Sequence, residues 1–211
     1  MEKINKANLK QILGEVLTVL NAEKEHLIEL DASMGDGDLG LTMTKGFKCV
    51  YDEIDNIDSD DIGVIFMKLG MKMNTTVAST MGTLMSICFI KGAKQVKGFT
   101  EIGLEEVVKM GHAAVSGVME RGKAKVGDRT MLDALSPAVD ALGVACAEKN
   151  NLAEAFEKAF QAAEKGVENT KQLVPVFGRA AYYKDRPLGT PDSGSVAIMF
   201  IFKGIKQAVN K

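Results

Sequence analysis

Apolar residues recur at three- and four-residue intervals in one segment of the chain after another. This spacing is typical of helices that bury one face. It predicts eight helices, near residues 3–28, 40–55, 62–74, 79–94, 102–121, 130–148, 152–173 and 193–209. Alternating apolar and polar runs flanked by hairpin turns, which would indicate strands, are absent from the sequence. The pattern therefore predicts an all-α fold.

The polar and glycine-rich clusters fall between these predicted helices. They are residues 31–40 (DASMGDGDLG), 78–83 (ASTMGT), 121–130 (RGKAKVGDRT) and 178–194 (GRAAYYKDRPLGTPDSG). If consecutive helices run antiparallel, every second connection lies at the same end of the bundle. We therefore expect these four clusters to meet in one site.

The length and charge of the chain indicate how many domains it forms and which kinds of partner it lacks. Its 211 residues are the size of one domain, so we expect residues 1–211 to form a single domain. With 26 basic and 28 acidic residues, the chain has no general attraction to nucleic acid or to an anionic membrane. The N-terminus lacks the apolar run of a signal peptide, and the three scattered cysteines suit reduced core residues. We expect a cytoplasmic protein with neither nucleic acid nor membrane as a partner.

Two short motif matches fail on their structural context. The glycines of residues 35–40 satisfy G-x-G-x-x-G, but that dinucleotide motif follows a strand, and a helix is predicted here. Asp36 and Asp38 would also repel a diphosphate unless a cation lay between them. Residues 117–124 come within one residue of a phosphate-binding P-loop, but they lack its Ser/Thr and follow no strand. Neither match is accepted as a nucleotide site.

Three carboxylates, those of Asp31, Asp36 and Asp38, fall within eight residues that also contain two glycines. Glycine permits the tight turns that would bring the carboxylates together, and their repulsion would then favour a bound cation. An EF-hand is excluded because its twelfth position would be Thr42 instead of Glu. Oxygen ligands without His or Cys favour Mg²⁺ over zinc. The alternative is a capping loop with Asp38 at the start of the next helix.

Magnesium held by few carboxylates usually serves a ligand that carries phosphate. Helix starts near Gly82 and Ser193 would offer backbone N–H groups to phosphate oxygens, and Arg129 and Arg179 could add bidentate charge. Each has an ordinary alternative, such as close helix packing for Gly82 or a surface ion pair for Arg179. Together they predict a nucleotide bound with Mg²⁺.

Three ordered motifs resemble the L-subunit family of dihydroxyacetone kinases, the nucleotide-binding component of those enzymes. They are L-D-A-x-x-G-D-G-D-x-G at 30–40, R-G-K-A-x-x-G-D-x-T-M-x-D at 121–133, and G-R-A-x-Y at 178–182 with D-x-G at 192–194. The resemblance implies a closed barrel of eight antiparallel helices, with ADP or ATP and two Mg²⁺ at one end. It implies that Asp31, Asp36 and Asp38 are the magnesium ligands, with no other catalytic residue assigned.

The resemblance also implies which residues contact the nucleotide. Phosphate contacts are expected at Leu39, Gly40, Leu41, Thr42, Thr80, Met81 and Gly82. The base is expected to lie beside Gly122 and Met131. The residues expected to close the site are Arg179, Asp192, Ser193 and Gly194.

The chain departs from the family pattern at three of these positions. Leu39 and Thr42 stand where the family usually has His and Asn, and Met81 stands where it usually has Ser. Leu and Met side chains cannot donate hydrogen bonds to phosphate. We expect an intact metal cage with altered phosphate contacts, as in a divergent branch acting on another small keto-sugar.

The leading hypothesis is a kinase subunit that carries the phosphoryl group to a hydroxyketone bound on a separate K-type subunit, since the chain is too short to include a substrate domain. The phosphoryl donor would be an M-type phosphocarrier protein that recharges bound ADP, or exchangeable ATP. His26 and His112 lie in predicted helices away from the four clusters, so neither is expected to hold the substrate. The alternatives are a non-catalytic nucleotide-sensing or regulatory protein and a structural bundle without metal.

Overall fold

The computed structural model describes residues 1–183 and 188–211, and in that part the protein is helical with no strand. Its helices are α1 (Lys6–Ala22), α2 (Lys24–Ala32), α3 (Leu39–Glu53), α4 (Ile62–Thr76), α5 (Thr80–Ala93), α6 (Leu104–Gly122), α7 (Leu132–Ala147), α8 (Leu152–Thr170) and α9 (Ser193–Val209). Two short 3-10 helices, η1 (Ile54–Asn56) and η2 (Arg179–Tyr183), lie in connections. The predicted all-α fold is confirmed.

The first predicted helix, near residues 3–28, is two helices in the structure. The chain bends at Glu23, which has φ −99° and ψ 9°, and α2 then continues to Ala32. Leu27 on α2 is fully buried, so the apolar spacing runs unbroken through the bend and gives no sign of it. The longer reach of α2 places Asp31 in a helical turn instead of a loop.

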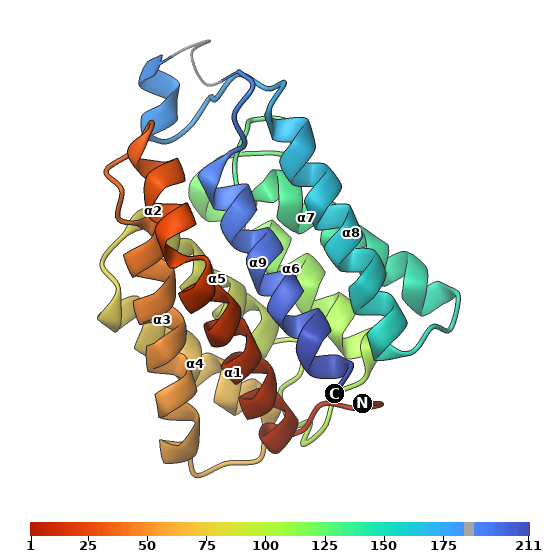
Figure 1. The fold of residues 1–211 in the computed structure, drawn as a ribbon. Helices are drawn as coiled ribbons and strands as arrows, with labels where there is room; N and C mark the ends of the chain where they lie inside the picture. Colours follow the sequence, from red (N-terminus) through yellow and green to blue (C-terminus); the bar gives the residue numbers. More distant parts are fainter. Residues whose placement is uncertain (184–187) are drawn as a thin grey trace.

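The helices form a closed ring, which Figure 1 shows from the side. Each of α3 to α9 packs against the next, and α1 closes the ring by packing against both α3 and α9. The α2 helix lies at one end, against α3 and α9. Large side chains such as Leu20, Leu69 and Leu132 are fully buried between the helices. Over the described residues, the structure thus confirms a barrel of eight helical elements, the first of which is bent.

The two ends of the barrel differ. The connections α2–α3, α4–α5, α6–α7 and α8–α9 gather at the upper end in Figure 1, as the alternation of helices predicted. Both chain termini lie at the other end, where the amino group of Met1 donates a hydrogen bond to the Val209 carbonyl at 3.3 Å. The chain ends therefore lie far from the polar and glycine-rich clusters.

Within residues 1–183 and 188–211, the helices are too short or too polar to cross a lipid bilayer. The cysteines Cys49, Cys88 and Cys146 all lie in this part, and each is a partly buried residue with a free thiol. Burial raises the pKa of the Cys88 thiol to about 12, which keeps it protonated at neutral pH.

Candidate functional site

A cleft of about 890 Å³ opens at the end of the barrel where the four connections meet. Its lining draws on all four, within residues 30–39, 78–84, 118–132 and 177–194. Every predicted cluster therefore contributes to one cavity, as the alternation of helix direction predicts. Residues 184–187, which fall inside the last cluster, lie outside the described part of the chain.

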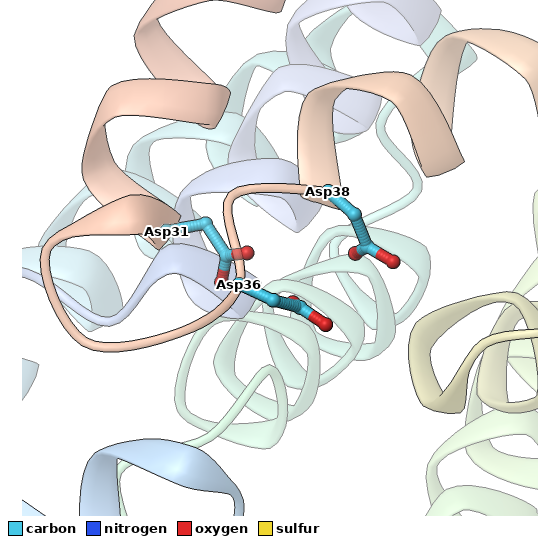
Figure 2. Close-up of side chains that lie close together, drawn as sticks. All are labelled: Asp31, Asp36 and Asp38. Atoms are coloured by element: carbon cyan, nitrogen blue, oxygen red, sulfur yellow. The ribbon is translucent and has the colours of Figure 1, made fainter.

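The three aspartates meet at the rim of this cleft. Asp31 lies in the last turn of α2, Asp36 in the connection, and Asp38 immediately before α3. One ligand oxygen from each lies within 4.8 Å of the others, and Figure 2 shows the three carboxylates pointing into the same space. Gly37, with φ +71°, makes the turn between the last two. The arrangement has the size and the ligand type of a site for a hard cation.

The electrostatics of this triad are unfavourable without a cation. Partial burial and the charges of Asp36 and Asp31 raise the pKa of the Asp38 carboxyl. Asp38 precedes α3, yet its side chain makes no hydrogen bond to the described first turn of that helix. The capping-loop alternative therefore does not account for Asp38. One compensating charge is present, because a guanidinium nitrogen of Arg179 lies 2.5 Å from an Asp36 carboxylate oxygen.

The start of α9 closes the cleft on one side. The Ser193 hydroxyl donates a hydrogen bond to the Asp31 carboxylate at 3.2 Å, which joins α9 to the triad. Asp192 caps the helix, since its carboxylate accepts a hydrogen bond from the Ser195 N–H at 2.7 Å. Burial raises the pKa of the Asp192 carboxyl to about 6. Gly194 also lines the cleft, so all three residues predicted here lie in it.

The first turn of α3 divides the residues predicted at 39–42. Leu39 lines the cleft and is almost fully buried. Gly40 faces α2 instead, so closely that a Cβ would lie 2.3 Å from the Lys24 carbonyl oxygen. Leu41 is 52% exposed and is not among the described lining residues, and Thr42 is buried beneath the cleft. Because a helix turns by about 100° per residue, four consecutive side chains cannot share one face.

The α4–α5 connection shows a similar division. Thr80 and Met81 line the cleft as predicted. Gly82 lies outside the described lining, because it packs against Val77, whose carbonyl oxygen would be 2.7 Å from an added Cβ. Ser79, which the sequence analysis did not assign, lines the cleft and caps α5 by accepting a hydrogen bond from the Gly82 N–H at 3.0 Å. Its position immediately before an apolar helix is the signal that could have identified it.

Two buried carboxylates shape the α6–α7 connection, which carries Met131 to the cleft. Asp133 accepts hydrogen bonds from the N–H groups of Gly127 at 2.6 Å and Thr130 at 2.8 Å. Asp128 accepts one from the Lys125 N–H at 2.8 Å. Both aspartates belong to the second sequence motif, and in the structure they hold the loop in shape. Gly122 and Met131, the two residues predicted beside the base, both line the cleft.

Arg129 lines the cleft, for which the sequence suggested a bidentate charge for a phosphate, and its guanidinium binds backbone carbonyls. It is almost fully buried, and its guanidinium donates hydrogen bonds to the carbonyl oxygens of Thr170 at 3.1 Å and Thr190 at 2.9 Å. Burial lowers the pKa of its guanidinium. These contacts tie Arg129 to both ends of the α8–α9 connection, an arrangement that sequence spacing does not reveal.

Several cleft residues were not assigned from the sequence. The polar ones are Ser79, Arg121 and Thr130. An apolar wall is formed by Leu84, Val118, Ala124 and Leu132 together with Met131. These apolar residues lie on α5, α6, α7 and the α6–α7 connection, and Leu30, Met34 and Leu39 add apolar lining beside the triad. The cleft thus offers carboxylates at its rim and apolar surface in its lining, which suits a ligand with a phosphate end and a flat apolar end.

The chain matches known proteins along most of its length. A family model described as the DAK2 domain matches residues 33–207. The chain is 32% identical over 193 residues to the ADP-binding subunit DhaL of the PEP-dependent dihydroxyacetone kinase of Escherichia coli strain K12, and 92% of each chain is covered. It is 28% identical to the ADP-binding subunit DhaL of the PTS-dependent dihydroxyacetone kinase of Lactococcus lactis, with 93% and 94% covered.

Among solved structures, the chain resembles the dihydroxyacetone kinase of C. freundii in complex with AMP-PNP and Mg²⁺. The TM-score is 0.71 at 27% identity, with 98% of this chain and 34% of that chain covered. The chain therefore spans about a third of that kinase, while it covers nearly all of the two bacterial subunits.

Proposed function

The chain belongs to the DAK2 domain family, and from that premise we propose that it is the nucleotide-binding subunit of a dihydroxyacetone-type kinase. It binds ADP or ATP with Mg²⁺ and carries the phosphoryl group to a small hydroxyketone bound on a separate K-type subunit. The observation that carries this proposal is the meeting of Asp31, Asp36 and Asp38 within 4.8 Å at the rim of the cleft.

The triad fits Mg²⁺ in its donor set and its charge. The carboxylates are hard oxygen ligands, and the pKa of Asp38 is raised in part by the charges of its two neighbours. Asp31, Asp36 and Asp38 would hold the metal, which when bound neutralises phosphate charge and orients the phosphates. Two Mg²⁺ per nucleotide are proposed, because three carboxylates and an ADP together carry roughly six negative charges.

The remaining lining suits the phosphates and the base. The N-termini of α3, α5 and α9 all point toward this end of the barrel, so their first backbone N–H groups are available to phosphate oxygens. In this arrangement Gly40 and Leu41 would contribute through the backbone alone, whereas the Gly82 N–H already donates to the Ser79 hydroxyl that caps α5. The hydroxyls of Thr80 and Ser193 add polar contacts, and the base lies against the apolar wall beside Met131.

The proposed acceptor site lies on a partner chain. In-line phosphoryl transfer needs the acceptor hydroxyl aligned with the terminal phosphate, and this positioning supplies most of the rate. Neither histidine can capture a carbonyl compound in the cleft, since His26 packs on the Phe200 ring and His112 lies exposed on α6, outside the described lining. The open end of the barrel is the surface on which a K-type subunit would dock.

The donor is proposed to be an M-type phosphocarrier protein that recharges bound ADP, with exchangeable ATP as the alternative. The names of the matched subunits, from PEP-dependent and PTS-dependent kinases, support the phosphocarrier. Nucleotides, Mg²⁺ and such carriers act in the cytoplasm, which remains the proposed location.

A second function, a nucleotide sensor without catalysis, is favoured by one observation. Leu39 and Met81 place apolar side chains in the cleft near the proposed phosphates, so this chain has fewer donors there than a His and a Ser would provide.

A coupled assay separates the two functions. The chain is incubated with Mg²⁺, ATP or a phosphocarrier system, and a panel of three- and four-carbon keto-sugars, with and without a K-type subunit. We expect turnover only with the K-type subunit. Turnover by the single chain would overturn the two-subunit proposal. Tight Mg²⁺–ADP binding without turnover in any combination would favour the sensor.

A further inference from the structure

Arg129 occupies a position that is costly for the chain. Its φ of +59° is a left-handed conformation, which costs a side-chain-bearing residue energy that glycine would avoid. The residue is 2% exposed, and a buried cation needs hydrogen bonds to offset its lost hydration. Glycine would avoid both costs, but only a long side chain can donate hydrogen bonds to the carbonyl oxygens of both Thr170 and Thr190. We call this pair of hydrogen bonds the bridge.

The bridge is part of a larger fastening of the α8–α9 connection. The Asp192 N–H donates to the Thr170 hydroxyl at 2.9 Å, and the Gly189 N–H donates to the Lys171 carbonyl at 2.8 Å. The last residues of α8 and the residues before α9 are therefore held together at the point where Arg129 enters. The neighbour of Arg129 in sequence, Asp128, fixes a further point, because its carbonyl accepts a hydrogen bond from the Val176 N–H at 3.2 Å.

Arg179 follows this fixed point by three residues. Its side chain is 64% exposed, so packing does little to hold it in place. Its guanidinium nevertheless reaches the Asp36 carboxylate at 2.5 Å across the mouth of the cleft. The preceding backbone is held at Val176 by Asp128, and Arg129 holds the same connection at its two ends.

We propose that Arg129 is a positioning residue for the nucleotide phosphates, and that it acts through Arg179. By holding the two ends of the α8–α9 connection against the α6–α7 connection, it keeps Arg179 facing the triad, where the phosphates of a nucleoside diphosphate or triphosphate would lie. This inference rests on the proposed nucleotide-binding function. It assigns Arg129 neither a contact with the phosphates nor a role in holding the metal.

A double-mutant cycle tests this coupling. Arg129→Met and Arg179→Met are made singly and together, and the affinity for Mg²⁺–ADP is measured by calorimetry. Each single variant is expected to bind about tenfold more weakly, the effect of one weakened charge-assisted hydrogen bond. The double variant is expected to bind within about twofold of Arg179→Met, because residues that act through one another are not additive. A double variant that binds about a hundredfold more weakly than the wild type, as two independent losses would give, would overturn the inference.

Two further measurements separate positioning from general damage. Mn²⁺ binding in the absence of nucleotide, followed by electron paramagnetic resonance, is expected not to weaken in Arg129→Met, because a displaced Arg179 no longer competes with the metal for Asp36. A loss of Mn²⁺ affinity parallel to the loss of nucleotide affinity would overturn the inference. Lys171→Met is the matched control. This substitution removes an ammonium group at the start of the same connection that pairs with Glu168 on α8. The variant is expected to bind nucleotide as the wild type does.

Folding of the variants is checked by circular dichroism. If Arg129→Met does not fold, Arg129→Lys and Thr170→Val replace it in the cycle, since the first keeps the charge with a single donor group and the second removes the acceptor of the Asp192 N–H. Their losses are also expected to vanish in the Arg179→Met background, and persistent losses would overturn the inference. Failure of the wild type to bind Mg²⁺–ADP would instead contradict the proposed function itself.

Discussion

Arg179 and Asp36 form an ion pair, 2.5 Å from nitrogen to oxygen, that joins the α8–α9 connection to the α2–α3 connection across the mouth of the cleft. Both side chains are substantially exposed, so the pair alone stabilises the fold by less than about 1 kcal/mol. The ion pair matters because Asp36 is also one of the three proposed metal ligands. A cation and Arg179 would compete for the same carboxylate until a phosphate arrives to bind both.

Asp36→Asn is expected to weaken the binding of Mg²⁺ and ADP together, by at least about tenfold, because it removes a charged ligand from the triad. The helical fold should be unaffected, since Asp36 is exposed and lies in a connection. Calorimetry with and without EDTA measures the effect. The matched control is Asp52→Asn, which removes an exposed carboxylate paired with Lys48 on α3. If neither EDTA nor the Asp36→Asn substitution changes the affinity for ADP, a metal-bridged site is ruled out.

Asp192 predicts a specific dependence of stability on pH. Burial raises the pKa of its carboxyl from 3.8 to about 6 in the folded protein, so the folded state binds the proton more tightly than the unfolded state does. This contribution is fully present below about pH 4 and is lost as the pH rises to about 6. The loss amounts to about 3 kcal/mol.

Asp192→Asn should remove that dependence and keep the helix cap, because Asn caps helices as well as Asp does. Urea unfolding of both proteins in EDTA, from pH 4 to pH 7, measures the difference. We expect the variant to gain stability relative to the wild type as the pH rises. A constant difference across this range would show that Asp192 titrates as an ordinary surface carboxyl.

Met81→Ser is expected to slow the release of ADP. Met81 lines the cleft at the start of α5, and a hydroxyl at this position could donate one hydrogen bond to a phosphate. A charge-assisted hydrogen bond contributes about 1.5–3 kcal/mol, so the affinity should rise by about tenfold or more. Stopped-flow displacement of a fluorescent ADP analogue gives the rate. The wild type should lose its ADP during purification, and one tightly retained ADP per wild-type chain would contradict this prediction.

Gly166→Ala is expected to destabilise the fold and to disturb the α6–α7 connection. An added Cβ would lie 2.1 Å from the Asp133 carbonyl oxygen, so α8 could approach α7 only with a shift of the backbone. The expected loss is about 2–3 kcal/mol in the free energy of unfolding. Gly143→Ala is the control, because its nearest neighbour would be 3.9 Å away and helix propensity should then add about 0.5–1 kcal/mol. Equal effects of the two substitutions on the melting temperature would contradict the close approach.

The features predicted correctly from the sequence are those that depend on spacing along the chain. Helical periodicity and the alternation of direction suffice to place four connections at one end. The glycines between Asp31 and Asp38 permit the tight turn that brings the three carboxylates together, and Gly37 makes that turn with φ +71°. The bend at Glu23 escaped prediction because the apolar stripe passes through it without a break.

The direction of individual side chains was harder to predict. Gly40, Leu41, Thr42 and Gly82 lie next to cleft residues in sequence, yet the helical turn carries each to another face. The role of Arg129 was also hidden, since its carbonyl partners belong to residues distant in sequence. Every residue has a backbone carbonyl, so the type of the partner residue does not indicate that its carbonyl accepts a hydrogen bond from Arg129.

The hydrogen bond between Met1 and Val209 shows that the two ends of the chain lie close enough to be joined. Because the first and last helices are neighbours in the ring, the order of helices has no privileged starting point. A short linker could join the two ends, and new ends could be cut at the same end of the barrel, between α5 and α6, without touching the cleft. Any domain joined to residue 1 or residue 211 would be tethered at the base of the barrel and would leave the opposite mouth free.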